Sequence, residues 1–440
     1  MGGGRATHPG QANAWVLAFA TNRLRLRLSR PELCDAKSVT DIKVYGAPWC
    51  PDCRRAKKFF TEHRVAYEFV DIDKDPEGLA YVERVQNGGR TIPTVVFPDG
   101  THLVDPGDDE LAGRLGLNVA AERDSYDVVI VGGGPAGLAA AIYAAREGLD
   151  ALVVEKAGLG GQAGVTERIE NYPGFPDGIG GGELADRFIA QARGYGVELL
   201  SAVRATEVQA DGDCLCVRLS TGQEVCAPAV LIATGSTYRR LGVPGEEDLI
   251  GAGVHFCAIC DGPFYRGAEE LMVIGGGNSA LEESLHLVQY AERIRVVTRG
   301  EVTASALVRD KINKDPRFTV QTNTDIVSLS GEGGRLTEVL ARDRVSGGEL
   351  RFTPQAAFVF IGLDPNTDWL GDTLRRDRWG FIVTDDAFAT SLPGVFCAGD
   401  VRAGATKQLG SAVGDGIAAL IAVRSYLQRR GDLVRVEINA

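Results

Sequence analysis

Two glycine-rich loops, each between an apolar run and a helix-like stretch, constrain the fold of this chain most strongly. The first contains Gly132, Gly134 and Gly137 in G-x-G-x-x-G spacing and follows the apolar run 126–131. A continuous apolar run of this kind predicts a strand buried on both faces of a sheet. The Ala-rich stretch after the loop predicts a helix, and a second strand follows at 151–154, so the segment reads as a βαβ unit with a parallel sheet.

This first loop has the features that bind the phosphates of a dinucleotide. A tight glycine turn, a helix N-terminus for a pyrophosphate and an acidic residue for a ribose hydroxyl occur together. The acidic residue is Glu155, directly after the second strand. A glycine turn without a ligand does not require all three features, so we expect a dinucleotide here.

The same architecture recurs later in the chain. Its parts are a strand at 271–274, the loop Gly275 to Ala280 in G-x-G-x-x-A spacing, a helix at 281–290 and a strand at 294–298. Hairpin-like segments follow each copy, with Gly and Asp turns at 211–213 and 331–334. Two such units predict two nucleotides, one a flavin and the other a nicotinamide donor.

The cysteines point to redox chemistry. Nine cysteines in 440 residues are too few for a disulfide scaffold, and four of them form the Cys-x-x-Cys pairs Cys50/Cys53 and Cys257/Cys260. The second pair lies between the two glycine loops, where a dithiol can receive electrons from a flavin and pass them outward. This cysteine usage fits a reducing cytoplasm.

The first pair belongs to a small α/β unit with predicted strands at 41–45, 66–71 and 94–97 and a helix at 54–63. Cys50 lies where the loop enters the helix, so the helix dipole should favour its thiolate. Asp52 opposes that effect, whereas four following cations should add to it: Arg54, Arg55, Lys57 and Lys58.

Pro93 precedes a strand, and a cis proline beside a redox pair would hold the backbone of a partner close. The alternative interpretation of Cys50 and Cys53 is that they form half of a zinc site. This unit contains no second Cys or His pair at ligand spacing, so we expect no metal.

Composition narrows the remaining possibilities. The length predicts about three domains, and the net charge of -12 disfavours nucleic acid and anionic membranes as partners. No apolar run approaches the ~18 residues of a spanning helix. We expect residues 1–38 to be a disordered tail. Most of their positive charge follows the apolar run 14–20, unlike that of a signal peptide, which disfavours export.

The unit at about 41–117 resembles the glutaredoxin family, and the stretches 85–94 and 97–100 are especially similar to mycoredoxins. The resemblance implies a thioredoxin fold. By the same resemblance, Cys50 is the attacking thiol, Cys53 the resolving thiol and Pro93 the cis proline.

Residues 125–440 resemble the low-molecular-weight thioredoxin reductases. The motifs that support this are Gly132 to Gly137, Gly160-Gly161-Gln162, Glu170 to Gly174, Ala233-Thr234-Gly235, Cys257 to Gly262, Ile361-Gly362 and Gly399-Asp400-Val401. The resemblance implies that Cys260 faces the flavin, Cys257 attacks the outgoing disulfide and Asp261 serves as acid or base. It also implies a smaller domain that rotates between two positions, and a homodimer.

The residues that the resemblance assigns to cofactors fall into two groups. The FAD group is Gly132, Gly134, Pro135, Ala136, Gly137, Glu155, Gly161, Gln162, Asn171, Ala233, Thr234, Gly235, Gly399, Asp400 and Gln408. The nicotinamide group is Gly275, Gly277, Asn278, Ser279 and Arg299.

The expected fold class is therefore α/β, a thioredoxin-fold domain followed by a two-domain flavoprotein with two Rossmann-like units. The expected division is a tail at 1–38, a glutaredoxin-like domain at 39–117, a linker at 118–124, an FAD-binding domain at 125–235 and 363–440, and a nicotinamide-binding domain at 236–362.

One departure from the family puts the choice of donor in doubt. Relatives that use NADPH carry His-Arg-Arg-x-x-x-Arg after the second strand, whereas the stretch 298–304 here keeps only Arg299. Gly300 and Ala304 cannot provide the bidentate fork that clamps a 2'-phosphate. Glu301 could repel that phosphate or accept from a ribose diol, so NADPH, NADH and a donor that is not a nicotinamide all stay open.

The leading hypothesis is a disulfide reductase that passes electrons from NAD(P)H through FAD and Cys257/Cys260 to Cys50/Cys53. The final acceptor is then a protein disulfide, a partner of thioredoxin or glutaredoxin type, or a low-molecular-weight disulfide. The alternatives are a peroxiredoxin-reducing flavoprotein, a flavin-dependent dithiol oxidase and a redox-sensing flavoprotein without turnover.

The remaining cysteines and histidines receive structural interpretations. Cys214 and Cys216 share one face of a predicted strand and could form a regulatory pair. Cys226 and Cys397 lie in apolar runs, which favours a packing role. His255 and His286 are read as structural; Cys34 lies in the tail.

Overall fold

The computed structural model of the chain describes residues 42–166, 168–333 and 335–432. The expected tail at 1–38, with Cys34, lies outside the described residues. The described residues belong to the compact unit at 40–440.

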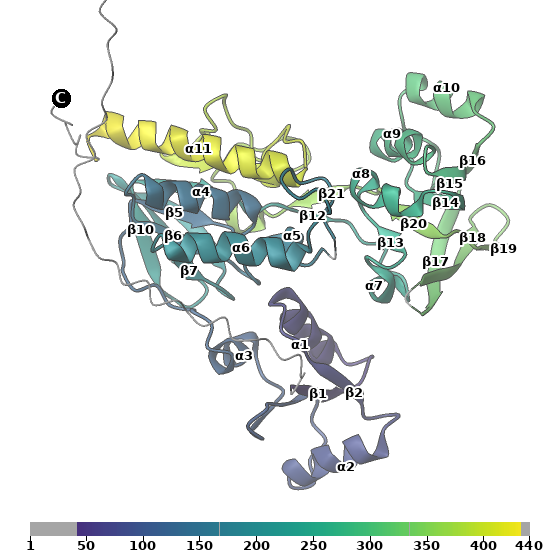
Figure 1. Cartoon of the computed structure of the whole chain (residues 1–440), viewed down its shortest axis with the longest axis horizontal. Coiled ribbons are helices and arrows are strands. Elements are labelled where there is room, and N and C mark those ends of the chain that lie inside the picture. The colour runs from purple at the N-terminus through teal and green to yellow at the C-terminus, as the bar shows by residue number, and fades with distance from the viewer. Residues whose placement is uncertain (1–41, 167, 334, 433–440) are drawn as a thin grey trace, which may run out of the picture. The chain divides into compact units, whose positions relative to one another are not determined.

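A small four-stranded sheet of order β2-β1-β3-β4 comes first in the chain (Figure 1). Strand β1 pairs parallel with β2 and antiparallel with β3, the mixed arrangement that the thioredoxin fold requires. Helix α1 begins at Pro51, earlier than the expected Arg54, because proline suits the first turn of a helix, where its missing N–H costs nothing. The elements are β1 Lys43–Gly46, α1 Pro51–Glu62, β2 Glu68–Asp71, α2 Pro76–Val85, β3 Thr94–Val96, β4 His102–Val104 and α3 Asp108–Arg114.

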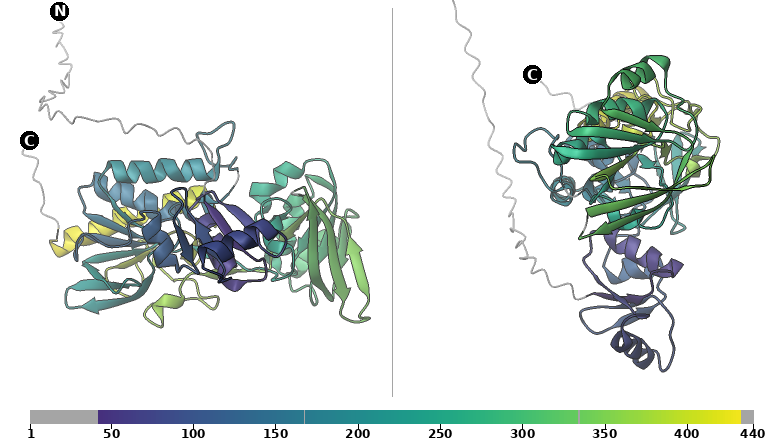
Figure 2. Two further views of the ribbon diagram at one scale, coloured as in Figure 1. Left: turned by 90° about the horizontal axis from the view of Figure 1, so that it is seen from below. Right: turned by 90° about the vertical axis from the view of Figure 1, so that its right-hand side faces the viewer.

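A five-stranded parallel sheet of order β22-β11-β5-β6-β7 contains the first βαβ unit. Side chains of β5 alternate between two cores, as expected for a strand buried on both faces. Val128 and Ile130 pack with helices α4, α6 and α11, whereas Val129 and Val131 pack with a three-stranded antiparallel sheet of order β10-β9-β8. The helices and that second sheet therefore cover opposite faces (Figures 1 and 2).

The bounds of these elements are β5 Val128–Val131, α4 Pro135–Arg146, β6 Ala151–Val154, α5 Gly161–Gly164, α6 Gly181–Gly194, β7 Glu198–Leu200, β8 Ala205–Asp211, β9 Cys214–Leu219, β10 Glu224–Ala227, β11 Ala229–Ile232, η2 Asp368–Leu370, β22 Val395–Cys397, η3 Gly399–Val401 and α11 Leu409–Arg430.

A second parallel sheet, of order β13-β20-β14-β15-β16, repeats the plan. Leu271 and Val273 of β14 pack with α9 and α10, and Met272 and Ile274 pack with an antiparallel sheet of order β17-β18-β19. The bounds are α7 Glu246–Leu249, β13 Val254–His255, α8 Ala258–Asp261, η1 Gly262–Tyr265, β14 Ala268–Ile274, α9 Asn278–Leu287, β15 Ala291–Val297, α10 Ala306–Lys314, β16 Phe318–Gln321, β17 Thr324–Glu332, β18 Arg335–Asp343, β19 Glu349–Phe352 and β20 Ala356–Val359.

A two-stranded ribbon connects these repeated units. Strands β12 (Ser236–Tyr238) and β21 (Leu363–Pro365) pair antiparallel, so the chain leaves the first unit and returns to it along adjacent strands. The fold class is thus the predicted one, a thioredoxin-fold unit followed by two Rossmann-like units. Within the described residues, no helix combines the length and apolarity needed to span a bilayer.

Candidate functional site

Cys50 and Cys53 occupy the N-terminus of α1. Cys50 is the residue that caps the helix, and the backbone N–H of Cys53 donates to its Sγ over 3.2 Å. Cys53 is completely buried, and this burial raises the pKa of its thiol to about 12. Cys53 therefore stays protonated at neutral pH, and the thiolate that this pair can supply belongs to Cys50.

Three of the four cations expected to support that thiolate interact with other groups. Arg55 pairs with Asp108 over 2.8 Å, and Lys58 lies 3.7 Å from Glu62. The Lys57 ammonium lies 4.7 Å from the centre of the Phe69 ring. These interactions reduce what the three cations can contribute to the Cys50 thiolate, and the helix N-terminus is a further source of positive potential.

The surroundings of Cys50 include a cis peptide bond and an exposed aromatic ring. The Ile92–Pro93 bond is cis, as predicted, and the Cys50 Sγ lies 3.8 Å from the Ile92 carbonyl oxygen. Trp49 is 66% exposed, with its indole N–H donating to Asp73 over 2.8 Å. The Cys50 side chain is itself buried, and the large aromatic ring of the preceding residue is open to solvent.

Cys257 and Cys260 repeat this local geometry at a shorter helix. They form a disulfide, Cys257 caps α8, and the Cys260 N–H donates to the Cys257 Sγ over 3.2 Å. Ile259, between the two cysteines, and the nearby Phe264 are 46% and 47% exposed. Both redox pairs are therefore bordered by exposed apolar side chains of the kind that dock a partner.

A partly buried chain of polar groups adjoins this second pair. The Asp261 carboxylate lies 3.5 Å from His255 Nδ1, and His255 Nε2 lies 2.6 Å from the Tyr265 hydroxyl. Burial raises the pKa of Tyr265 to about 12, so its hydroxyl stays protonated and can donate to Nε2, which leaves an Nδ1–H facing Asp261. The sequence alone favours a structural role for His255 and gives no sign of Tyr265, because no local motif links either residue to Asp261.

The first glycine loop has the shape of a phosphate cradle. Gly132 has φ +114°, and a Cβ there would lie 2.3 Å from the Ala233 carbonyl oxygen. A Cβ on Gly137 would lie 1.8 Å from the Gly132 carbonyl oxygen, so glycine allows α4 to begin directly against the strand. The Glu155 carboxylate accepts from the backbone N–H of Gly133 over 2.7 Å, and its burial raises its pKa.

The other residues assigned to FAD lie at ends of elements that meet this loop. Pro135 and Ala136 begin α4, Gly161 and Gln162 begin α5, Ala233 to Gly235 follow β11, Gly399 and Asp400 form η3, and Gln408 caps α11. Asp400 supplies the best test of fit: its buried Oδ1 has no hydrogen-bond partner among the described residues. A cradle of glycines and an unpaired buried acceptor suit a phosphate-bearing ligand with hydroxyl groups, as FAD is.

Side chains from this group lie near the second cysteine pair. Asn171 Nδ2 is 3.3 Å from Gln408 Oε1 and 3.8 Å from the Cys260 Sγ. Gln408 Nε2 is 4.0 Å from the Cys257 Sγ. Residues that the sequence assigned separately to cofactor and catalysis therefore come together.

The second glycine loop, at 275–280, resembles the first in its backbone and in the helix that follows it. Gly275 has φ +147°, Gly277 caps α9, with Ser279 in its first turn, and the Asn278 side chain accepts from the Ser305 N–H over 2.7 Å. These backbone N–H groups at a helix N-terminus suit a second pyrophosphate.

Arg299 has a basic neighbour that the sequence did not reveal. Arg344 donates to the Arg299 carbonyl oxygen over 3.0 Å, and both guanidinium groups contact Asp325, at 3.1 and 3.4 Å. Glu301 instead accepts from Asn323 over 3.3 Å. Arg344 follows β18, far along the chain, and no spacing rule connects it to Arg299.

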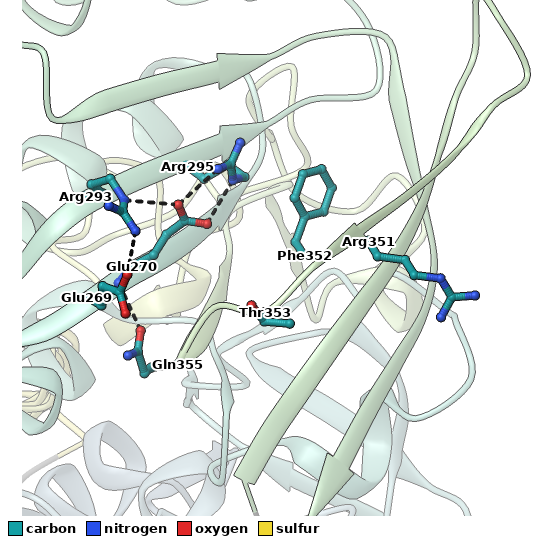
Figure 3. A pocket seen from close by; sticks show the side chains of 8 residues that line it. All are labelled: Glu269, Glu270, Arg293, Arg295, Arg351, Phe352, Thr353 and Gln355. Carbon is teal, nitrogen blue, oxygen red and sulfur yellow. Dashed lines mark hydrogen bonds and ion pairs between the residues drawn. The ribbon is translucent and has the colours of Figure 1, made fainter.

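A hollow of about 240 Å³ on the second Rossmann-like unit is a weaker candidate for a binding site (Figure 3). Its charges neutralise one another: Arg295 binds Glu270 through two contacts of 2.9 and 3.0 Å, and Arg293 binds Glu269 over 2.9 Å. Because these groups are paired and neither cysteine pair lines the hollow, we assign it no role.

Comparison with known proteins covers both parts of the chain. Residues 126–416 match the family model of the pyridine nucleotide-disulphide oxidoreductases, and residues 42–103 match the glutaredoxin model. Thioredoxin reductase of Listeria innocua is 37% identical over 320 residues, which are 72% of this chain and 99% of the relative. That of Treponema pallidum is 39% identical over 303 residues, 69% of this chain and 97% of the relative.

A solved structure agrees with these sequence matches. The crystal structure of thioredoxin reductase from Streptococcus pyogenes is 37% identical, with a TM-score of 0.66, and covers 70% of this chain and 99% of its own. The chain is thus matched by the pyridine nucleotide-disulphide oxidoreductase model over residues 126–416 and by the glutaredoxin model over residues 42–103.

Proposed function

This chain belongs to the pyridine nucleotide-disulphide oxidoreductases and is a flavin-dependent disulfide reductase with an N-terminal glutaredoxin domain, and from that premise we propose the route of its electrons. They pass from Cys257/Cys260 to Cys50/Cys53 and then to a disulfide substrate. One observation carries the proposal: both pairs have the same geometry, in which the first cysteine caps a helix and its sulfur accepts from the backbone N–H of the second cysteine.

The proposed steps balance in bonds and electrons. When bound, FAD and a nicotinamide supply the hydride and the electron pair that open the Cys257–Cys260 disulfide. The Cys257 thiolate then attacks the Cys50–Cys53 disulfide, and one cysteine of that pair leaves as a thiolate. Cys260 attacks the Cys257 sulfur of the mixed disulfide, which re-forms the Cys257–Cys260 disulfide and releases the other cysteine of the pair. Asp261, held by His255, supplies or accepts the proton at these sulfur atoms.

The second half uses the glutaredoxin pair. The Cys50 thiolate attacks the substrate disulfide, one substrate sulfur leaves with a proton, and Cys53 resolves the resulting bond. Burial of Cys53 keeps it protonated until Cys50 has reacted, which orders the two attacks. Protein disulfides are the substrates that both matched families indicate; we extend the proposal to low-molecular-weight mixed disulfides such as those of mycothiol.

We further propose the division that the sequence suggests: 39–117 as the glutaredoxin-like domain, 118–124 as linker, 125–235 with 363–440 for FAD, and 236–362 for the nicotinamide. The β12/β21 ribbon at the proposed boundaries supports this division. The proposed assembly is a homodimer and the proposed compartment is the reducing cytoplasm, from family resemblance and cysteine usage.

For the donor, we propose NADPH. Arg344 lies against Arg299 and supplies a second guanidinium beside the second loop, which compensates for the arginines missing at 300 and 304. Anaerobic mixing with NADPH and, separately, NADH tests this through bleaching of flavin absorbance. Faster bleaching by NADPH is expected, and bleaching by NADH alone would reverse the assignment.

Steady-state turnover tests the route. Cys50→Ser should leave flavin bleaching intact and abolish reduction of a mycothiol- or glutathione-type mixed disulfide, whereas the exposed Cys214→Ser control should leave both unchanged. Unchanged turnover in Cys50→Ser would refute the route.

A further inference from the structure

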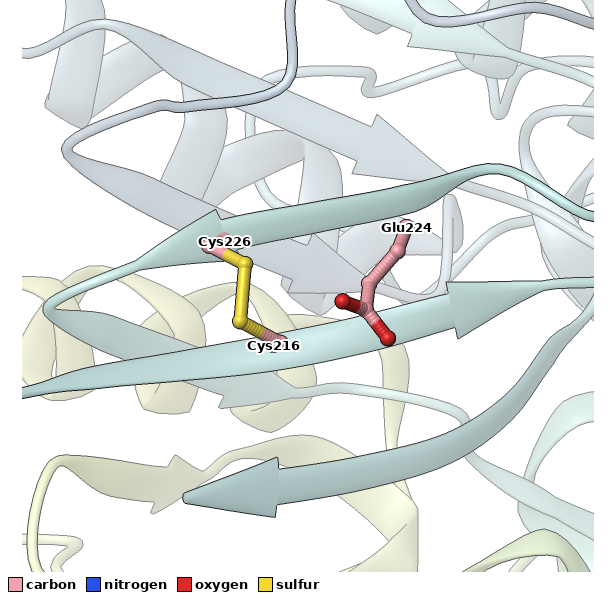
Figure 4. Close-up of side chains that lie close together, drawn as sticks. All are labelled: Cys216, Glu224 and Cys226. Carbon is pink, nitrogen blue, oxygen red and sulfur yellow. A yellow bond between two sulfur atoms is a disulfide. The ribbon is translucent and has the colours of Figure 1, made fainter. Parts of the chain in front are cut away.

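A second disulfide lies away from both redox pairs, on the sheet β10-β9-β8. Cys216 of β9 is bonded to Cys226 of β10 (Figure 4). Leu215 and Val217 on either side of Cys216 point into the core, so Cys216 occupies the opposite, outward face. The interpretations of Cys216 as a partner of Cys214 and of Cys226 as a packing residue are therefore both corrected.

The sheet itself holds the two sulfur atoms together. Cys216 and Cys226 are direct partners in the antiparallel register of β9 and β10. Only 10 positions separate them in sequence, and the backbone ladder already closes that hairpin. A disulfide stabilises mainly by restricting a loop that is otherwise open, so this bond adds little that the ladder does not provide. Opening it leaves both thiols facing each other, ready to close again.

The environment of the bond differs at its two ends. Cys216 is only 7% exposed, whereas Cys226 is partly exposed. The Glu224 carboxylate lies within 4.8 Å of both sulfur atoms (Figure 4). Arg218, on the same face of β9, contacts Glu224 at 3.5 Å and Glu207 at 2.7 Å.

We propose that Cys216 and Cys226 form a second, reversible thiol–disulfide site, with Cys226 as the sulfur that reacts with small thiols and dithiols. The site is separate from the route between Cys257/Cys260 and Cys50/Cys53 and does not depend on that route.

The exchange balances with a dithiol as reductant. One thiolate of the dithiol attacks the Cys226 Sγ, the bond to Cys216 breaks, and Cys216 leaves as a thiolate that takes up a proton. The second thiol of the reductant attacks the mixed disulfide, releases Cys226 as a thiol and leaves the reductant oxidised. A monothiol stops at the first step and stays on Cys226 as a mixed disulfide.

Glu224 slows the attack. Its negative charge opposes an approaching thiolate and raises the free energy of the Cys216 thiolate that leaves. Neutralising Glu224 should accelerate opening of the Cys216–Cys226 disulfide roughly threefold, because a weak, partly screened charge interaction changes a rate by about this factor. Glu207 contacts the same arginine but is not in the group of ligand atoms around the sulfurs, so it is the matched control.

The test is differential alkylation of the folded, full-length protein followed by mass spectrometry of the peptide that contains both cysteines. Cys216 and Cys226 should be unlabelled in the oxidised protein, labelled after dithiothreitol, and unlabelled again after an oxidised low-molecular-weight disulfide is added. A monothiol should add its mass at Cys226. E224Q should be opened about threefold faster than wild type, and E207Q at the wild-type rate.

Two results would overturn the proposal. In one, both thiols are labelled before any reductant is added. In the other, they stay unlabelled in excess dithiothreitol while Cys257 and Cys260 become labelled, and react only after unfolding. Because dithiothreitol replaces the enzyme's own electrons, either result leaves the proposed route through Cys50 untouched.

Discussion

The two Cys-x-x-Cys pairs share a backbone arrangement and differ in what surrounds them. In each, the second cysteine donates its backbone N–H to the first sulfur over 3.2 Å. Cys50 and Cys53 lie among apolar side chains, Ala47, Phe69 and Ile92. Cys257 and Cys260 instead adjoin the polar chain from Asp261 through His255 to Tyr265. In the proposed route the shared geometry supplies a reactive thiol in each pair, and only the second pair adjoins side chains that can transfer a proton.

The largest expected effect is the loss of the shared reactive sulfur. Cys257→Ser should lower disulfide turnover by about a thousandfold or more, as removal of a covalent nucleophile does. Steady-state kinetics with a protein disulfide measures it, with Cys214→Ser as the control. A loss of less than tenfold would mean that the two pairs are not in series.

The next effect tests the difference in proton handling. Asp261→Asn should lower turnover by roughly a hundredfold, the usual size of a general acid–base contribution, and should flatten the pH profile of turnover. Asp52→Asn, beside the first pair, should leave both nearly unchanged. Equal losses in the two variants would remove the distinction between the pairs.

A pH series sharpens the same comparison. Because burial raises the pKa of Cys53 to about 12, its thiol stays protonated below that pH and loses its proton only above it. In the reduced protein, iodoacetamide should therefore label Cys50 at pH 7 to 9 while Cys53 stays unlabelled until the solution is strongly alkaline. Simultaneous labelling of both thiols at pH 8 would contradict the assigned order of attack.

A smaller effect concerns the donor that feeds the second pair. Arg344→Ala should raise the KM for NADPH about tenfold, the value of one lost charge-assisted contact to phosphate, and leave that for NADH unchanged. Arg351→Ala, in the paired charged hollow of Figure 3, is the control. Equal changes in the KM for NADPH and for NADH would show that Arg344 does not bind the 2'-phosphate.

The smallest effect concerns the apolar border of the first pair. Trp49→Ala should raise the KM for a protein disulfide about fivefold, as expected for an exposed aromatic side chain at a docking surface. Trp379 is 60% exposed and lies within residues 126–416, outside the glutaredoxin match, so Trp379→Ala is the matched control. An unchanged KM in Trp49→Ala would assign docking to other residues.

Local sequence patterns predicted much of the fold because their causes are local. The strand at 151–154 was predicted with its observed bounds, and the glycine loops at 132 and 275 lie where the spacing placed them. Strand β4 was not predicted, because a strand of three residues shows too little periodicity. Helix α2 was not predicted either, although Asp75 caps it and Pro76 begins it, which are local signals of a helix start.

Contacts across strands and between distant segments could not be predicted in this way. The pairing of Cys216 with Cys226 depends on strand register, and the meeting of Arg299 with Arg344 depends on how a turn folds back. His255 acquires its relation to Asp261 only when β13 and α8 pack. A single sequence holds no pattern that fixes such distances.

The most direct test of the account follows electrons between the two pairs. The protein is oxidised so that Cys50 and Cys53 form a disulfide, mixed anaerobically with NADPH, quenched with an alkylating reagent and analysed by mass spectrometry. In the wild type, Cys50 and Cys53 should become labelled as flavin absorbance bleaches. In Cys257→Ser the flavin should still bleach while Cys50 and Cys53 stay unlabelled. Labelling of these two cysteines at the wild-type rate in that variant would contradict the proposed route.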